Sequence, residues 1–356
     1  MNKALVTIGV LLITVLAALS IAVVFSASGQ SVDRTLGQAR NFAFAVIVLW
    51  ITANVAPQQL MRLAIPVYMA GLGLLIGVAL VGENRNGATR WLHLGVISIQ
   101  PSEIMKIGVP LLLAWFFHRK EAGLEIKDYL IATLFVLVPA ALIMKQPDLG
   151  TAVLVFSSGF FVIFLAGLSW KLMISAGLAG LAAMPFIWPR LHDYQRNRVL
   201  TFLDPSTDPL GAGYHITQST IAIGSGGVLG KGWLNGTQSQ LDFIPERSTD
   251  FILAVFGEEF GLLGLLLLLT LYLIVIGRGL MIAMNAPTTF SRLLAGAITM
   301  TFFTYGFVNI GMVTGTLPVV GVPLPLVSYG GTAILSMFMG FGILMSISTH
   351  KRLVST

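Results

Sequence analysis

Cysteine is absent from the 356 residues, and charged residues make up only 10% of them. Without cysteine, the chain can form no disulfide and has no thiolate nucleophile or metal ligand. The five histidines are scattered and lack the spacing of a metal site. The net charge of +6 is not gathered into one patch, so it does not indicate a nucleic-acid surface.

Long apolar runs are abundant. Hydrophobic residues make up 56% of the chain, and runs of about 20 apolar residues are typical of membrane-spanning helices. We therefore predict an all-α polytopic membrane protein with ten spans, forming a single domain over residues 1–356. The predicted spans are residues 4–26, 40–56, 63–82, 102–118, 128–144, 149–167, 171–189, 249–277, 291–314 and 328–349. A long outer loop, at about 190–248, is expected between the seventh and eighth spans.

Basic residues predict the orientation of these spans. With the amino terminus in the cytoplasm, ten lysines and arginines fall in the short inner segments, and five fall in the short outer ones. The inner set is Lys3, Arg62, Arg119, Lys120, Lys127, Lys171, Arg278, Arg292, Lys351 and Arg352, and the outer set is Arg34, Arg40, Arg85, Arg90 and Lys145. Because basic residues are enriched in cytoplasmic loops, both termini are predicted to be cytoplasmic. The unusual polar segments then lie outside, which indicates an external working face.

Asp250 lies where the long polar loop meets the eighth predicted span. One interpretation is a helix start, in which Ser248 or Thr249 caps the helix and Asp250 favours the positive end of its dipole. The other is a general base at the membrane surface, held ionised while facing a partly dry cavity. The two interpretations are compatible, because a dipole that keeps Asp250 ionised also positions it.

Glu103 and Lys106 are three residues apart, so they share one face of the fourth predicted span. Lys106 lies about one turn inside the apolar region, and charges there usually face a polar interior and pair with one another. The pair is therefore either an internal salt bridge that holds helices together or a site at which Lys106 contacts an anionic substrate group.

Two further acids have a structural and a functional interpretation. Asp148, in the turn Gln146–Thr151, is either a turn-forming residue or part of the site. Glu258 lies two turns into the eighth predicted span, on nearly the same face as Asp250. For Glu258 we favour structural pairing over catalysis.

Outer arginines, among them Arg90 and Arg198, would suit a pyrophosphate, because guanidinium groups bind phosphate in a bidentate way. Solvent exposure is the plainer alternative for each. Residues 224–232 look like a nucleotide phosphate loop, but Ser225 and Gly232 replace residues which that motif requires. Without a nucleotide-binding domain, a sugar transferase of this build would need a lipid-linked donor.

Several polar motifs distributed along nearly the whole chain form a specific combination. They are Gly87–Trp91, Gln100–Glu103 with Lys106, Gln146–Thr151, Asn235–Leu241, Phe243–Ile252, Glu258–Glu259 with Gly261, Asn309 with Gly311 and Gly315, Leu317–Pro318, Gly321, Pro323–Leu326 and Ser328–Gly331. This combination resembles the SEDS family (shape, elongation, division and sporulation). Pro245–Arg247 is most similar to the branch that acts in rod-shaped elongation. Ser248 stands where many relatives have histidine, which leaves Asp250 and its flanks intact.

The resemblance implies a ten-span peptidoglycan glycosyltransferase of the bacterial cytoplasmic membrane, which polymerises lipid II into β-1,4-linked strands at the outer face. It also implies as partners a class B penicillin-binding protein and other elongation-complex membrane proteins. The family's essential carboxylate corresponds to Asp250. Lys106, Glu103, Arg90 and Asp148 correspond to positions that the family keeps polar around its outer cavity.

In that mechanism Asp250 takes the proton from the acceptor 4-hydroxyl as it attacks the donor's anomeric carbon, in one inverting displacement. Lys106 and the loop arginines, including Arg198, would stabilise the leaving pyrophosphate. A divalent cation could assist, although the sequence shows no dedicated metal cage. Two other functions stay open: a flippase for the same lipid, and a non-catalytic scaffold for the penicillin-binding protein.

Overall fold

The computed structural model describes residues 3–85, 88–94, 97–120, 123–191, 193–209 and 211–350. Each of the ten predicted spans coincides with one long helix in it. These helices are α1 (Lys3–Ala27), α2 (Val32–Ala53), α3 (Pro57–Val81), α4 (Pro101–Arg119), α5 (Ile126–Lys145), α6 (Leu149–Leu165), α7 (Trp170–Ile187), α11 (Ile252–Met284), α12 (Thr289–Val313) and α13 (Gly331–Thr349). The prediction of an all-α polytopic membrane protein is confirmed at this level.

Eight of these helices are long and apolar enough to cross a membrane. The other two are α4 and α6. Helix α6 is apolar but has only 17 residues, and α4 carries Glu103, Lys106 and Arg119 among its 19 residues. Since about 20 apolar residues span the hydrocarbon core, the count of ten spans stays a prediction.

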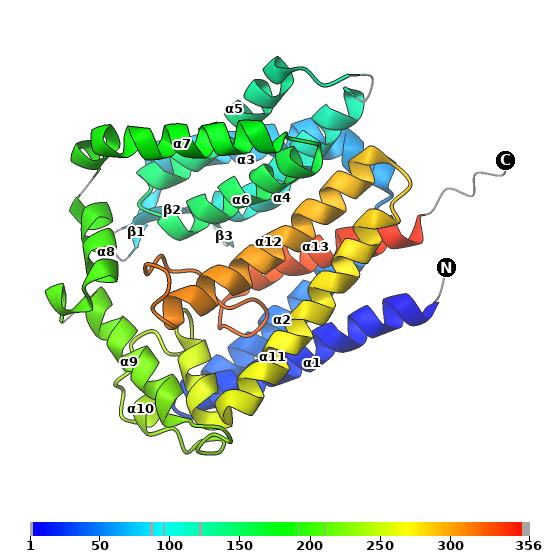
Figure 1. The fold of residues 1–356 in the computed structure, drawn as a ribbon. Coiled ribbons are helices and arrows are strands. Elements are labelled where there is room, and N and C mark those ends of the chain that lie inside the picture. Colours follow the sequence, from blue (N-terminus) through cyan, green and yellow to red (C-terminus); the bar gives the residue numbers. More distant parts are fainter. Residues whose placement is uncertain are drawn as a thin grey trace.

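The segments expected as outer loops contain helices and strands that were not predicted. Between α7 and α11 lie α8 (Asp193–Leu203), α9 (Ala212–Ser225), α10 (Thr237–Gln240) and the 3-10 helices η1 (Trp188–Arg190) and η2 (Pro205–Thr207). Between α3 and α4 lies an antiparallel sheet in the order β1 (Glu83–Arg85), β2 (Ala88–Leu94) and β3 (Ile97–Ile99). Figure 1 shows these elements at one end of the helices and both chain termini at the other.

Helix α12 forms the centre of the bundle and packs against α4, α6, α11 and α13. Most of its apolar stretch is buried inside the protein. By contrast, α7 lies at the periphery, and none of its residues, all of which the structure describes, is buried. Helix α7 is therefore mainly exposed at the outside of the bundle, whereas α12 is buried and contacts the helices around it.

Helix α11 is interrupted near its start. Gly261 has φ 62° and ψ −162°, and a Cβ there would lie 2.3 Å from the backbone nitrogen of Gly230. Only glycine fits this conformation and this close approach. The loop after α9 pairs with both sides of the break: Leu262 N donates to Gly227 O at 2.9 Å, and Lys231 N donates to Glu258 O at 3.0 Å. These hydrogen bonds at the break hold the polar segment 226–240 against the first part of α11.

Candidate active site

Asp250 lies in a turn just before α11, not in the helix itself. The membrane-spanning helix begins at Ile252, and its N-cap is Phe251, with no capping hydrogen bond from a side chain. The expectation that Ser248 or Thr249 caps this helix is therefore wrong. The Ser248 hydroxyl instead accepts from Arg34 Nη1 at 3.3 Å, and that of Thr249 donates to Glu246 Oε2 at 2.9 Å. Segment 248–250 forms a turn of its own, fixed by contacts with other elements.

Asn309, on the central helix α12, holds the backbone of Asp250. Its Nδ2 donates to Asp250 O at 2.8 Å and to Val322 O at 2.7 Å. The side chain of Asn309 is fully buried. One amide group thus connects the Asp250 turn to the segment between α12 and α13, and fixes both to the core of the bundle.

Residues that precede α13 support the same turn. Ser328 Oγ donates to Thr249 O at 2.5 Å, and Tyr329 N donates to Ser248 O at 2.9 Å. Gln38, buried on α2, donates to Ser328 O at 3.0 Å. The turn that carries Asp250 is therefore positioned from α2, α12 and the start of α13, all distant in sequence.

The Asp250 carboxylate lies against the backbone of Gly321. A Cβ at Gly321 would be 3.3 Å from Asp250 Oδ2, and Gly321 has φ +74°. Both the contact and the left-handed conformation favour glycine. Gly321 thus places no side chain of its own against the carboxylate.

Four charged residues act on this carboxylate. Burial, above all, raises the pKa of the Asp250 carboxyl to about 6, and the negative charges of Glu246 and Asp148 add to the rise. The positive charges of Arg90 and Arg198 act in the opposite direction and lower that pKa. We call these five residues the Asp250 cluster. At neutral pH its central acid is mostly ionised, yet its pKa is close enough to neutrality for proton transfer.

Arg90 and Asp148 contact each other within the Asp250 cluster. Arg90 Nη2 donates to Pro147 O at 2.8 Å, and its Nε lies 3.7 Å from Asp148 Oδ2. Asp148 is buried, and its Oδ1 accepts from Thr151 N at 3.1 Å, which caps α6. The predicted turn-forming role of Asp148 is thus confirmed in its geometry, while any role toward a substrate stays a prediction.

Glu103 and Lys106 pair as their spacing predicted, with Lys106 Nζ 2.6 Å from Glu103 Oε1. Lys106 also donates to the Tyr305 hydroxyl, and Ser336 Oγ donates to Glu103 Oε2 at 2.6 Å. Lys106 is only 4% exposed. This network joins α4, α12 and α13 inside the bundle, which matches the salt-bridge alternative. Contact of Lys106 with a pyrophosphate stays a prediction.

Glu258 has a structural environment. It is fully buried, and its carboxylate accepts from Lys231 Nζ at 2.7 Å, Gln238 N at 2.9 Å and Ser239 N at 3.2 Å. These bonds fix the start of α10. The expected shared helix face with Asp250 does not form, because Asp250 precedes the helix.

His215, Asn309 and Glu246 were not predicted as site residues, although Asn309 and Glu246 each stand in one of the motifs that carry the resemblance. His215, on α9, stacks on Phe251 with ring centroids 5.3 Å apart. Burial lowers the pKa of His215, while the charges of Glu246 and Asp208 oppose this change. Neither His215 nor Asn309 lies close to Asp250 in the sequence, so local patterns could not connect them. Glu246 was within reach, since it stands four residues before Asp250.

Metal binding has no preformed site in the part of the chain that the structure describes. No group of three or more histidine or carboxylate side chains there is arranged to hold an ion.

Together, these observations define a multi-pass membrane protein with a carboxylate centre at one end of its helices. The family model described as cell cycle protein, which covers FtsW, RodA and SpoVE, matches residues 2–353. The chain belongs to this family, known as the SEDS family.

Named relatives and solved structures agree with this assignment. The peptidoglycan glycosyltransferase MrdB of Escherichia coli K12 is 51% identical over 349 residues, covering 97% of this chain and 94% of the relative. A protein of the same name from Helicobacter pylori 26695 is 38% identical, with 89% and 84% covered. A chain in a solved peptidoglycan synthase complex, which coordinates polymerization and crosslinking, has a TM-score of 0.83 at 31% identity, with 96% of each chain covered. The rod shape determining protein RodA of Thermus thermophilus has a TM-score of 0.72 at 28% identity, with 96% and 95% covered.

Proposed function

We propose that this chain is a peptidoglycan glycosyltransferase that polymerises lipid II during cell elongation and releases polyprenyl pyrophosphate. Relatives that bear the name peptidoglycan glycosyltransferase share half of its residues over nearly its whole length. The observation that carries the proposal is the state of Asp250. It is a half-buried carboxylate with a pKa of about 6, with arginines near it and a glycine against one side.

The proposed topology has ten spans in the bacterial cytoplasmic membrane, with both termini in the cytoplasm and the Asp250 cluster outside. The distribution of lysine and arginine supports this orientation. Helices α4 and α6 both pack against α12, and helices shielded from lipid by protein need less hydrophobicity than those that face it. The proposal treats the whole chain as one domain.

In the proposed reaction, the 4-hydroxyl oxygen of the acceptor sugar attacks the anomeric carbon of the donor. The bond from this carbon to the pyrophosphate oxygen breaks, and Asp250 receives the hydroxyl proton. A single displacement inverts an α-linked donor into a β-1,4-linked product, so one base suffices. The contacts from Asn309 and Ser328 support this role, because they fix the backbone of Asp250 before substrate arrives.

The leaving pyrophosphate gains negative charge as its bond to the sugar breaks, so cations near it would stabilise the transition state. Arg90 and Arg198 are the proposed cations, because both already act on the Asp250 carboxylate. Lys106, held by Glu103, is a second candidate deeper in the bundle. Lys106→Met should then lower kcat while its melting temperature stays close to that of the wild type. A loss of activity that only follows a loss of folded protein would assign Lys106 to helix packing.

The proposed partners are a class B penicillin-binding protein that crosslinks the new strands and other membrane proteins of the elongation complex. This proposal is supported by the solved relative, which comes from a complex that coordinates polymerization and crosslinking. No nucleic acid is proposed as a partner.

The deciding experiment measures strand synthesis from purified lipid II by the wild-type chain and by Asp250→Asn, each with the partner present. The Asn variant keeps the shape of the side chain but cannot accept the proton, so the rate of synthesis should fall by about 10²–10⁴ while the chain remains folded. Normal synthesis by Asp250→Asn would remove Asp250 from the mechanism. The same preparations, reconstituted in vesicles, test lipid translocation. A chain that moves lipid II but makes no strands is a flippase, and one that does neither yet restores partner activity is a scaffold.

A divalent cation is tested in the same assay by adding a chelator. If the cation bridges the carboxylates and the pyrophosphate, chelation should abolish strand synthesis, and Mg²⁺ should restore it. If synthesis continues unchanged, the arginines are sufficient to balance the leaving group.

A further inference from the structure

Two large apolar side chains lie next to each other on the loop between α9 and α10, at the end of the bundle away from the termini (Figure 1). Val228 is 59% exposed and Leu229 is 77% exposed. They lie between Gly227 and Gly230, whose φ angles of 58° and 80° turn the chain back on itself. We call residues 227–230 the apolar tip. Exposing adjacent apolar side chains to water is unfavourable, so the tip predicts an apolar environment around it.

Backbone hydrogen bonds fix the apolar tip against the break in α11. Gly230 N donates to Gly226 O at 2.9 Å, which closes the turn, and Leu263 N donates to Val228 O at 3.1 Å. A helix that restarts after a break has first N–H groups without partners inside the helix, and in a membrane such groups need an acceptor. The tip provides this acceptor, so it lies at the same depth as the point where α11 restarts.

The apolar surface of the tip continues onto the exposed face of α11. Before the break, Ile252–Glu259 are all buried within the protein. After it, Leu262 and Leu263 are about half exposed, and Leu266 and Leu267 extend this exposed apolar face along the helix. Helix α11 is long and apolar enough to cross a membrane, and exposed leucines of a membrane-spanning helix face lipid. Contact with lipid therefore begins at the level of the break and of the apolar tip.

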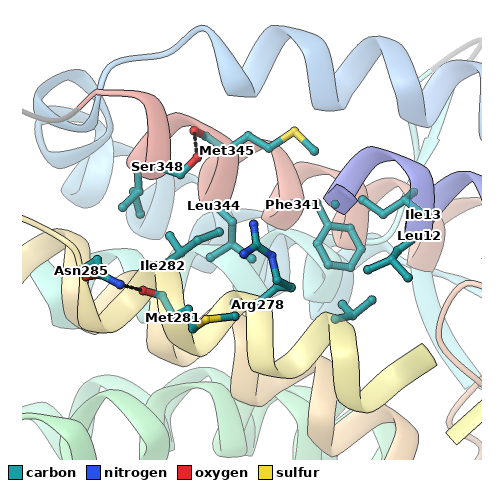
Figure 2. A pocket seen from close by; sticks show the side chains of 14 residues that line it. Leu12, Ile13, Arg278, Met281, Ile282, Asn285, Phe341, Leu344, Met345 and Ser348 are labelled. Atoms are coloured by element: carbon teal, nitrogen blue, oxygen red, sulfur yellow. Dashed lines mark hydrogen bonds between the residues drawn. The ribbon is translucent and has the colours of Figure 1, made fainter. Parts of the chain in front are cut away.

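The length of α11 beyond the break matches the thickness of a bilayer. Figure 2 shows Arg278 and Asn285 on the part of this helix that lies toward its carboxyl end. Arg278 follows Gly261 by roughly 25 Å and Asn285 follows it by roughly 36 Å, at about 1.5 Å per residue. The hydrocarbon core, about 30 Å thick, fits between these limits. The break, and the apolar tip with it, therefore lies at one boundary of that core, which is the outer boundary in the proposed topology.

Trp233 lies close to the same break, because the preceding residue, Gly232, donates its N–H to Glu259 O at 2.9 Å. The indole Nε1 of Trp233 donates to Ala22 O on α1 at 3.1 Å, and its ring centroid is 6.0 Å from that of Phe25. Nevertheless, 45% of Trp233 is exposed. A tryptophan with a satisfied N–H and an exposed ring is typical of the membrane interface.

We infer that the apolar tip inserts into the lipid bilayer and anchors the polar segment 226–240 at the membrane surface. The binding partner is the lipid itself, at the junction between head groups and acyl chains. Val228 and Leu229 enter the acyl region from a turn whose backbone is fixed to α11. This inference requires only that α11 crosses a membrane, so it is independent of the reaction proposed for Asp250.

The first test uses the absence of cysteine, because one introduced cysteine then carries a fluorescent label at a single known position. Full-length Leu229→Cys, Leu273→Cys and Asp193→Cys are labelled and placed in vesicles of phosphatidylethanolamine and phosphatidylglycerol, with iodide on both sides. Leu273, an exposed residue near the middle of α11, is the lipid reference, and Asp193, with a side chain 95% exposed, is the water reference. The label at position 229 should lose quenching by iodide, as the label at 273 does. Quenching as strong as at position 193 would overturn the inference.

The second test measures depth with lipids that carry a nitroxide quencher either beside the head group or midway along the acyl chain. The head-group nitroxide should be the stronger quencher at position 229, and the mid-chain nitroxide the stronger one at position 273. The same preference at both positions would contradict the placement of the tip at the boundary. If Leu229→Cys does not fold, Val228→Cys tests the neighbouring exposed residue. Protection from iodide that appears only when the proposed penicillin-binding partner is added would assign the tip to a protein interface and overturn the inference.

Discussion

Asp250 and Glu258 are eight residues apart, and the fold uses their carboxylates in opposite ways. Glu258 is fully buried and accepts hydrogen bonds from Lys231 and from two backbone amides of α10. Asp250, by contrast, is bonded through its backbone carbonyl, which accepts from Asn309 Nδ2. Among the described residues, no hydrogen bond or ion pair of at most 4 Å is found for its carboxylate.

This difference distinguishes a carboxylate that stabilises the fold from one that is placed to react with a substrate. A carboxylate that already accepts several hydrogen bonds stabilises the loop it binds, but it is poorly placed to accept a proton from a substrate. A carboxylate that is partly desolvated and has unoccupied lone pairs can accept one. The protein thus fixes the position of Asp250 through the main chain and leaves its side chain available for reaction.

The largest expected effect comes from Asp250. Asp250→Asn should lower the rate of strand synthesis by about 10²–10⁴, the usual contribution of a general base, because the amide cannot take up the hydroxyl proton. Its melting temperature should match that of the wild type, since the backbone bond from Asn309 does not involve the side chain. Synthesis from purified lipid II and thermal unfolding in detergent measure the two effects. If Asp250→Asn is inactive because it unfolds, Asp250 has a structural role as Glu258 has, and the proposed contrast between the two carboxylates is wrong.

The converse is expected for Glu258. Glu258→Gln leaves Lys231 without its buried counter-charge, and breaking such a pair should lower the free energy of unfolding by about 3 kcal/mol. The activity of the fraction that stays folded should change far less than in Asp250→Asn. Denaturant unfolding of the purified protein measures the loss. Asp193→Asn is the control, because Asp193 forms an exposed pair with Arg196 and should leave the melting temperature unchanged. Unchanged stability of Glu258→Gln would contradict the structural role.

Asn309 tests whether the main-chain support of Asp250 matters for the reaction. Asn309→Ala removes the donor shared by Asp250 O and Val322 O, so the carboxylate should shift and kcat should fall on the order of tenfold to a hundredfold. KM should change little, because Asn309 is buried behind the site. Asn54→Ala, at an exposed asparagine that bonds only within its own helix, should leave kcat unchanged. A loss confined to KM would mean that Asn309 shapes the binding of substrate instead.

The smallest effects concern pH. In the proposed mechanism Asp250 acts in its ionised form, and its pKa is about 6, so kcat/KM should rise as the pH increases through about 6. Glu246 raises this pKa, so Glu246→Gln should move the rise to lower pH. Arg90 lowers it, so Arg90→Gln should move the rise to higher pH. If neither variant moved the midpoint of the kcat/KM profile, the titration would belong to another group.

Local sequence patterns predicted much of the fold. The apolar runs gave ten helices close to the observed positions, because lipid-facing helices need a nearly continuous apolar surface. The spacing of Glu103 and Lys106 predicted their pair, since residues three apart meet on one helix face. The helices α8 and α9 and the small sheet were missed, because their residues show no comparable apolar run and the strands have only three to seven residues.

The sequence by itself determined that the chain crosses a membrane, that its unusual polar residues gather toward one side, and that Asp250 stands at the boundary of a span. These are properties of neighbouring residues, and hydropathy and charge report them directly. Only the tertiary structure decided how the Asp250 turn is held, and which donors the carboxylate of Glu258 meets. The position of the turn depends on Gln38, Asn309, Gly321 and Ser328, which reach the Asp250 turn from distant helices and loops. Contacts between such distant residues form only when the helices pack, so no local pattern contains them.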